Sequence, residues 1–547
     1  MIQELHCFAL AVAQAGAFIH CHSSLSEYRE LYRRERDNLL QNEETQGQDP
    51  YALAVYSTWR LSYDKLGTSA RSFLQICSLL HHEGISEGMF EKAALSQLSL
   101  EDSELQDEVT KLLNQFGKQD SSWSSWAFQK VVMQLGSHSL IEYDRQNRTY
   151  SIHPLVHHWS GTTVEGSLHD RQKLILAIIG LSFSLTNTYE DIVYRRTLLK
   201  HATGSIVSLK PEGINPLVGT HIAQIYAEAG RYKETAELEM MVMETRKRVL
   251  GNDHPETLKI MIRLAETYGS QGRWSDAEAL EVVVMEKRKL ALGDEHPDTL
   301  ESIGSLSNTY LSQGRWKEAE ALEVVLVQKR KRALGDDHPD TLISMGNLAS
   351  AHWHQGQFKE AEALELAVLE KRKRVLGEDH PATLVSMGNL ANIYKSQGRL
   401  DDAEALGLVV IEKRKRLLGD DHPYTLRAML NMAVTYWEQG RWNDAEALQV
   451  VTMEKLKRVL GDDHHWTLDN MANLADTYKD QGRLDDAAAL QEAVMERRKQ
   501  VLRDEHPDTL KIMSSLAATY RDLGRMNNAE ALEAMVEEHH RKRHDGS

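Results

Sequence analysis

The sequence predicts an all-α protein in which about eight stacked helix pairs form a solenoid behind a mostly helical domain of another kind. Three observations lead to this fold class. Ten prolines among 547 residues, about 2% where about 5% is usual, leave long stretches free for helices. A glycine recurs every 42 residues through the C-terminal three-fifths of the chain, and a His-Pro dipeptide keeps the same step. Residues 1–210 lack that step, so they form a separate part.

The recurring unit divides into two helices around the glycine. In one copy, Pro381 suits the first turn of the first helix, where its missing N–H is not needed. Apolar residues then recur at spacings of three and four from Leu384 to Tyr394, which predicts one buried face. Gly398 suits the left-handed conformation that ends many helices. The second helix is expected to bury Ala403, Leu406, Val409 and Val410. The turn glycines are Gly230, Gly272, Gly314, Gly356, Gly398, Gly440, Gly482 and Gly524.

A pair of helices this short cannot bury its apolar face alone, so the copies are expected to stack into a solenoid over residues 213–545. The pattern NLAxxYxxQGRxxxAEALxxxVxExRKRxLGxDHPxTL resembles the 42-residue tetratricopeptide repeat of kinesin light chains over about residues 213–543. The resemblance implies a right-handed superhelix whose first helices line a concave groove.

The resemblance also places one asparagine per unit on the concave side. A side-chain amide carries a donor and an acceptor, so a ladder of amides could hold an extended peptide through its backbone. The alternative is that these are exposed polar residues, copied passively when the unit was duplicated. The predicted peptide-binding residues are Asn308, Asn347, Asn389, Asn392, Asn431 and Asn473.

Other residues replace the asparagine toward the ends of the array, and a large side chain stands six residues after it in several copies. The end copies carry His221, Arg263, Ser305 and Ser515. Trp353 and its equivalents could determine ligand specificity, or they could pack between helices. The sequence leaves both readings open.

Each second helix ends in a basic run such as Lys371–Arg374, and an acidic loop follows. The runs favour the negative end of the helix dipole, and we interpret them as neutralised structural charge rather than a nucleic-acid surface. The net charge of −17 agrees with that interpretation, and we expect no nucleic-acid partner. The repeated DDH and DEH triplets do not converge into a cage, so we expect no metal.

The N-terminal part is expected to hold an apolar helix over Phe8–Ile19 and two helices over Thr58–Leu80 that break near Gly67. A polar stretch, Ser99–Ser125, is expected to be a flexible connection or an exposed helix. A hairpin over Leu140–Ile152 then leads into a helix, which suggests a winged helix-turn-helix. The predicted divisions are residues 1–50, a helical remnant; 51–165, a winged-helix-like domain; 166–212, a helical linker; and 213–545, the array.

These segments resemble the downstream half of the NB-ARC nucleotide-binding module of fungal NLR-type signalling ATPases. ALAVAQAGAFI is similar to the family's GLPLA helix, and IHPLVHHW is similar to its MHD motif. The resemblance implies that His153 is a remnant of a diphosphate contact, with Pro154 in place of the aspartate. No G-x-x-x-x-G-K-[ST] phosphate loop occurs in the sequence, so we expect no bound cofactor and no ATP hydrolysis.

Other function classes have little support. Three cysteines suit a reducing compartment, and the first apolar run of 13 residues is too short for a membrane span, so we expect a cytoplasmic protein. His153 and His157 lack a third metal ligand, and no nucleophile signature is visible, so we expect no enzyme. The leading hypothesis is a protein-interaction scaffold of an NLR-like protein that binds peptides or partner proteins in its groove. The alternative is a kinesin-light-chain-like cargo adaptor, although the heptad coiled coil expected of one is not apparent.

Overall fold

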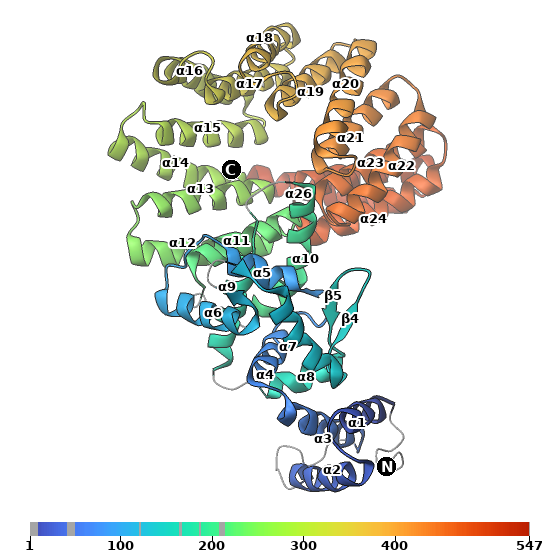
Figure 1. Cartoon of the computed structure of the whole chain (residues 1–547). Coiled ribbons are helices and arrows are strands. Elements are labelled where there is room, and N and C mark those ends of the chain that lie inside the picture. Colours follow the sequence, from blue (N-terminus) through green and yellow to red (C-terminus); the bar gives the residue numbers. More distant parts are fainter. Residues whose placement is uncertain are drawn as a thin grey trace. The chain divides into compact units, whose positions relative to one another are not determined.

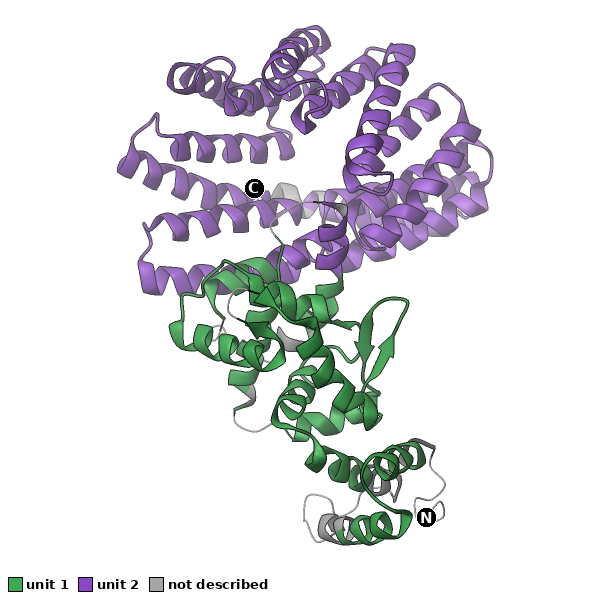
Figure 2. Cartoon of the chain, viewed as in Figure 1, with its two compact units in different colours: residues 1–185, 197–222 green, residues 186–196, 223–547 purple. Residues whose placement is uncertain are grey.

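The computed structural model describes residues 9–40, 50–119, 122–163, 167–184, 188–206 and 214–545. The chain forms two compact units (Figure 2). One consists of residues 1–185 and 197–222, and the other of residues 186–196 and 223–547. Within the described ranges, strands occur only in the first unit.

The first unit is mostly helical, with two small antiparallel sheets, ordered β1-β5-β4 and β2-β3. It contains α1 (Ala9–His22), α2 (Leu25–Leu40), α3 (Pro50–Lys65), α4 (Thr68–Cys77), β1 (Ile85–Ser86), α5 (Glu87–Leu95), α6 (Ser103–Phe116), β2 (Lys118–Gln119), β3 (Ser122–Trp123), α7 (Ser125–Ser137), β4 (Glu142–Asp144), β5 (Thr149–Ser151), α8 (Pro154–Thr162) and α9 (Leu168–Leu181). Two further helices, α10 (Tyr189–Ile206) and α11 (Pro216–Glu228), divide between the units.

Most elements predicted for this region are present. The predicted break near Gly67 falls between α3 and α4, and β4 and β5 form the predicted hairpin that leads into α8. The polar stretch Ser99–Ser125 differs from its prediction, because α6 buries one of its faces. That face carries Leu105, Val109, Leu112, Leu113 and Phe116. The acidic residues between them conceal the apolar spacing in the sequence.

Phe116 belongs to the aromatic core of the first unit. Its ring centroid lies 5.2 Å from that of Phe73, and the Phe90 and Phe128 rings each lie 5.3 Å from Phe73. Four helices, α4, α5, α6 and α7, each contribute one of these rings. The core therefore depends on α6, although the polar composition of that segment is typical of a solvent-exposed stretch.

Helix pairs follow one another through the rest of the chain, curving round as Figure 1 shows. After α11 they are α12 (Tyr232–Leu250), α13 (Pro255–Ser270), α14 (Trp274–Leu292), α15 (Pro297–Ser312), α16 (Trp316–Leu334), α17 (Pro339–His354), α18 (Phe358–Leu376), α19 (Pro381–Ser396), α20 (Leu400–Leu418), α21 (Pro423–Glu438), α22 (Trp442–Val459), α23 (His465–Asp480), α24 (Leu484–Leu502), α25 (Pro507–Asp522) and α26 (Met526–Asp545).

The ends of the repeat helices follow from local chemistry. His380 is the N-cap of α19, where its Nδ1 accepts a hydrogen bond of 3.2 Å from the Ala382 N–H. The same histidine caps every first helix from α13 to α25. Gly398, with φ of +75°, adopts the left-handed conformation predicted for it.

Packing within the repeats is as predicted for the first helices and differs in one place for the second. Ala403 and Val410 of α20 are buried, with 1% and 2% of their surfaces exposed, but Val409 is 39% exposed. The prediction for Val409 was wrong because it lies six residues after Ala403, about 240° further round the helix. Ile411 is buried in its place.

Neighbouring repeats are joined by a recurring polar clamp. Glu404 of α20 accepts hydrogen bonds from Gln439, at 2.8 Å, and from Arg441, at 3.0 Å, in the turn after α21. The Arg441 guanidinium also lies 4.1 Å from the centre of the Tyr436 ring. Equivalent clamps form on Glu278, Glu362 and Glu446.

The basic runs pair with acidic loops, as the sequence predicted. Lys413 lies 2.8 Å and Arg416 2.6 Å from the carboxylate oxygens of Asp379, in the loop one repeat earlier. Arg374 pairs with Asp337 in the same way. These ion pairs are largely exposed, so each contributes little to stability. Their main consequence is that the runs are not free basic patches.

The array curves far enough for distant repeats to meet. The Tyr232 hydroxyl of α12 lies 3.1 Å from Nδ1 of His465, which is 233 positions later. Helix α12 also contacts α24 (Figure 1). A Cβ on Gly272 would lie only 2.8 Å from Cδ2 of His506, so a larger residue there would have to displace the imidazole ring. The array therefore completes one superhelical turn and closes on itself.

Candidate binding site in the repeat array

The first helices of the pairs lie on the inner side of the curve. Successive first helices contact each other directly, at α13–α15, α15–α17, α19–α21 and α21–α23. Successive second helices make no comparably strong contact with each other in the described array. The two second helices that do meet, α12 and α24, touch across the turn. Helices on the inner side of a curved stack approach more closely, so the first helices line the concave face as expected.

The predicted asparagines differ in how accessible they are. Asn308, Asn389 and Asn431 are exposed, whereas Asn347, Asn392 and Asn473 are half-buried. The Asn347 amide donates hydrogen bonds to Glu323 Oε1, at 3.1 Å, and to Asn308 Oδ1, at 3.2 Å. Two of the six amides therefore already pair with each other.

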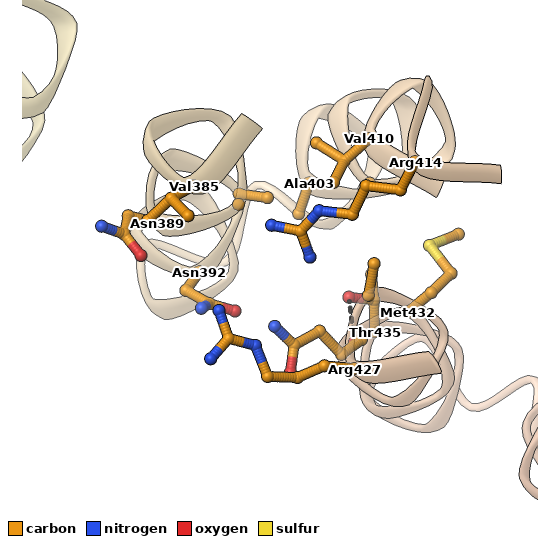
Figure 3. A pocket seen from close by; sticks show the side chains of 14 residues that line it. Val385, Asn389, Asn392, Ala403, Val410, Arg414, Arg427, Met432 and Thr435 are labelled. Carbon is orange, nitrogen blue, oxygen red and sulfur yellow. Dashed lines mark hydrogen bonds between the residues drawn. The ribbon is translucent and has the colours of Figure 1, made fainter. Parts of the chain in front are cut away.

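Three of the asparagines surround one cavity of about 320 Å³ (Figure 3). Asn389 and Asn392 come from α19, and Asn431 comes from α21. Residues of α20, among them Gly407 and Arg414, complete the wall. Asn308, Asn347 and Asn473 are not part of this cavity.

The residues at the end positions of the array have structural contacts. His221 is 6% exposed, and its Nδ1 lies 2.8 Å from the Gly180 carbonyl oxygen. The Arg263 guanidinium lies 3.7 Å from Glu239 Oε1. The Ser305 hydroxyl donates to the Glu301 carbonyl of its own helix. These side chains fill or pair locally.

The large residues six positions further on connect neighbouring first helices. Trp353 Nε1 donates to the Ser396 hydroxyl at 2.8 Å, and Trp437 Nε1 donates to Asp480 Oδ2 at 2.7 Å. Lys479, in the same position, lies 2.9 Å from Asp522 Oδ2. This arrangement supports the packing reading of the two tryptophans.

Sequence reasoning missed a row of buried carboxylates between the helices of successive pairs. These glutamates are 0–3% exposed, and burial raises their pKa values, to about 7 for Glu239, Glu281 and Glu365. The signal in the sequence was a glutamate in the same place of successive copies, at the end of A-E-L-E in the first copy and of E-A-L-E in the next three. The row consists of Glu239, Glu281, Glu323 and Glu365.

A row of buried arginines runs beside the carboxylates. Each is 5–8% exposed and donates to a backbone carbonyl in the first turn of the next first helix, as Arg414 does to Tyr424 at 2.8 Å. Each belongs to a basic run that the sequence analysis interpreted as structural charge neutralised by acidic loops and the helix dipole. The row consists of Arg246, Arg288, Arg330, Arg372, Arg414 and Arg498.

The histidines singled out in the first unit have local partners. His153 is the N-cap of α8, and its Nδ1 accepts a hydrogen bond of 3.3 Å from the Leu155 N–H. His157 Nε2 lies 2.8 Å from the Leu80 carbonyl oxygen. Over the described ranges, no group of three His, Cys, Asp or Glu side chains could hold a metal ion. No helix in those ranges is long and apolar enough to span a bilayer.

Family models match much of the chain. One tetratricopeptide repeat model matches residues 299–340, 341–382, 383–424 and 425–465, and a second matches residues 217–289 and 470–542. Residues 61–165 match a domain of unknown function, DUF7779, rather than a nucleotide-binding module. No curated protein matches the chain.

Several solved structures are similar to parts of the chain. A putative kinesin light chain of Podosopora anserina with nearly identical TPR-like repeats is 28% identical, over 39% of this chain and 99% of that one, with a TM-score of 0.31. A signal transduction ATPase with numerous domains and a tetratricopeptide repeat sensor, from Pyrococcus horikoshii, is 14% identical over 91% of this chain and 74% of that one, with a TM-score of 0.33. The quorum sensor NprR of B. thuringiensis is 14% identical over 64% and 96%, with a TM-score of 0.42.

The family matches and the geometry agree on the repeat. The matched ranges follow the helix pairs, and the 42-residue step recurs in the N-caps, the turn glycines and the clamps between copies. The solenoid of this chain is therefore an array of tetratricopeptide repeats.

Proposed function

We propose that the array is a protein-interaction scaffold that binds an extended peptide along its inner face. What supports this is the convergence of Asn389, Asn392 and Asn431, from two successive first helices, on one open cavity. Each amide offers both a donor and an acceptor, which a peptide bond needs from its partner. Backbone binding of this kind would leave the choice of sequence to the neighbouring side chains.

Peptides selected from a random phage-display library on the wild-type chain provide the probe for this proposal. Replacing Asn389, Asn392 and Asn431 together by Ala should weaken binding of a selected peptide at least tenfold, measured by fluorescence anisotropy. The matched control is Asn527→Ala, an exposed asparagine at the start of the second helix α26, which should leave the affinity unchanged. Equal affinities for the triple variant and the wild type would refute the amide clamp.

We also propose that residues 5–205 are related to the regulatory half of NLR-type nucleotide-binding modules. The support is the sequence resemblance and the hairpin that precedes α8. The His-Pro step at His153 has a second explanation, because it caps α8 in the way the repeat histidines cap their helices. Because the phosphate loop is absent, equilibrium dialysis with labelled ADP should detect no binding, and measurable binding would contradict the interpretation of His153 as a remnant.

A further inference from the structure

The buried arginines of the array are compensated in almost every copy. Arg288 lies 3.0 Å from Glu301, and Arg498 lies 2.5 Å from Asp469. Arg330 and Arg372 each donate at 2.7 Å to a serine hydroxyl of the next first helix and lie near the buried glutamate two turns earlier on their own helix. An unpaired buried charge destabilises the folded state, so these partners are needed to stabilise the buried arginine of each repeat.

The fifth copy keeps its arginine, Arg414, but has lost each of those partners. The buried glutamate is replaced by Gly407, and the serine is replaced by Ala428. Asp469 precedes Arg498 by 29 residues, and at that distance before Arg414 the chain has Val385. Glu301 follows Arg288 by 13 residues, and at that distance after Arg414 the chain has Arg427. Arg414 retains the hydrogen bond to the Tyr424 carbonyl, which carries no charge. The sixth copy shows the alternative solution, since it has replaced the arginine itself with Leu456.

The space left by these replacements is the cavity beside Asn389 and Asn431. A Cβ on Gly407 would meet only the Met432 sulfur, at 3.1 Å, so the missing glutamate side chain accounts for part of the void. Figure 3 shows Arg414 reaching into the cavity from α20, and Arg427 extending towards Asn392. Two guanidinium groups and three amides thus line it, and no carboxylate does among the described residues.

The two guanidinium groups affect each other. Burial, together with the positive charge of Arg427, lowers the pKa of Arg414 to about 10, and burial also lowers the pKa of Arg427. Both remain protonated at neutral pH. Arg427 is steadied by the Tyr424 and Trp466 rings, each 5.4 Å from its guanidinium carbon. The cavity therefore holds two fixed positive charges that none of its lining side chains neutralises.

We propose that this cavity binds an oxyanion, the carboxylate or phosphate group of an acidic peptide in the groove, between Arg414 and Arg427. Guanidinium groups match both oxyanions through paired N–H donors, and the asparagine amides add neutral donors. The volume accommodates such a group together with the side chain that carries it. The peptide as carrier rests on the proposed function above, whereas binding of the oxyanion itself does not.

The repeat supplies its own test variant, Gly407→Glu. It restores the residue found in the four preceding copies, so the variant should fold, and its carboxylate should occupy the cavity. Val409→Glu is the matched control, because it adds the same charge on an exposed position of the same helix. Arg427→Gln, which removes a half-buried charge, tests the site from the other side.

Thermal unfolding with inorganic phosphate, and separately with succinate, measures oxyanion binding at constant ionic strength. A saturable rise in Tm of roughly 2–4 °C is expected for the wild type and for Val409→Glu. Gly407→Glu should show no rise, and Arg427→Gln should need at least fivefold more anion. No saturable rise in the wild type, or the same rise in Gly407→Glu, would overturn the proposal.

A second measurement identifies the carrier. Fluorescein-labelled (Ala-Glu)5 should bind the wild type at least tenfold more tightly than (Ala-Gln)5, and Gly407→Glu should remove that preference. If phosphate and succinate act as expected but neither peptide binds, the oxyanion site stands and the peptide-binding function fails. If both peptides bind equally well to the wild type, the function stands and the acidic carrier is wrong.

Discussion

At the scale of single residues, departures from the repeat occur in coupled sets. The copy that has His352 in place of the recurring tyrosine also has Gln357 in place of its arginine, and these two side chains hydrogen-bond each other. Gly407 likewise accompanies Ala428 and Arg427 around one cavity. The positions of the asparagines and of Gly407 are visible in the sequence. The position seven residues before Arg414 is a buried glutamate in the four preceding copies. That burial could not be foreseen, because a charged residue on a helix is usually exposed.

The buried carboxylates make stability depend on pH. Burial raises the pKa of Glu281 from its ordinary value of 4.5 to about 7, so the folded state binds this proton more tightly than the unfolded state does. The resulting stabilisation is complete below pH 4.5 and is lost as the pH rises through about 7. We expect the wild type to be less stable at pH 8 than at pH 5.5.

Replacing Glu281 by Gln should remove part of this dependence, because Gln449 and Gln491 already occupy the same position in later copies. Relative to the wild type, the variant should gain about 2 kcal/mol more at pH 8 than at pH 5.5. Urea denaturation at the two pH values measures both. Glu286→Gln, on the exposed side of the same helix, should keep the wild-type dependence, and an unchanged slope in the Glu281→Gln variant would count against the buried carboxylate.

At the scale of elements, helix starts were the most predictable feature and helix faces the least. Nine of the ten prolines begin a described helix, including Pro50, Pro154 and Pro216 outside the recurring position. Proline acts within the first turn of a helix, so the start of that helix can be predicted from the local sequence alone. Burial of α6 depends on what packs against it, and that information lies in distant segments, whereas the exposure of Val409 follows from its angle around its own helix.

The capping histidines yield a prediction at this scale. His380 is exposed, so His380→Ala removes the hydrogen bond to the Ala382 N–H and little packing. The variant should lose about 1 kcal/mol of stability in its part of the array, measured by urea denaturation. His380→Asn retains a capping acceptor and should stay close to the wild type. If both variants lost the same stability, capping would not be the role of this histidine.

At the scale of the whole molecule, the array is a solenoid whose end repeats touch across one turn. The copy that lost the recurring proline is the copy that makes this contact, because His465 stands where the others have proline and meets Tyr232. Burial lowers the pKa of His465 to about 4, so the ring is neutral and its Nδ1 can accept from the tyrosine hydroxyl. The missing proline was visible in the sequence, but its partner 233 positions away was not.

Restoring the proline should open the turn locally. His465→Pro keeps the start of α23 but removes the partner of Tyr232. Amide hydrogen exchange around residues 230–234 and 461–466 should accelerate about tenfold, while the middle repeats stay protected. Trp442→Phe is the matched control, because Trp442 occupies the position of Tyr232 in a later copy and its side chain is 40% exposed. This variant should leave hydrogen exchange unchanged. Unaltered exchange in His465→Pro would show that the contact does not hold the turn.

The contact between Tyr232 and His465 also limits the mechanics of the array. A solenoid with free ends behaves as a spring that lengthens by small adjustments at every joint. Once coil touches coil, lengthening must first break the touching residues, so the array resists stretching as a ring does. Its inner circumference is then fixed by one turn, and a ligand that follows the inner face over that distance comes to lie beside the repeats where it started. A longer chain must leave along the axis, which sets an upper limit on the segment that the inner face can read.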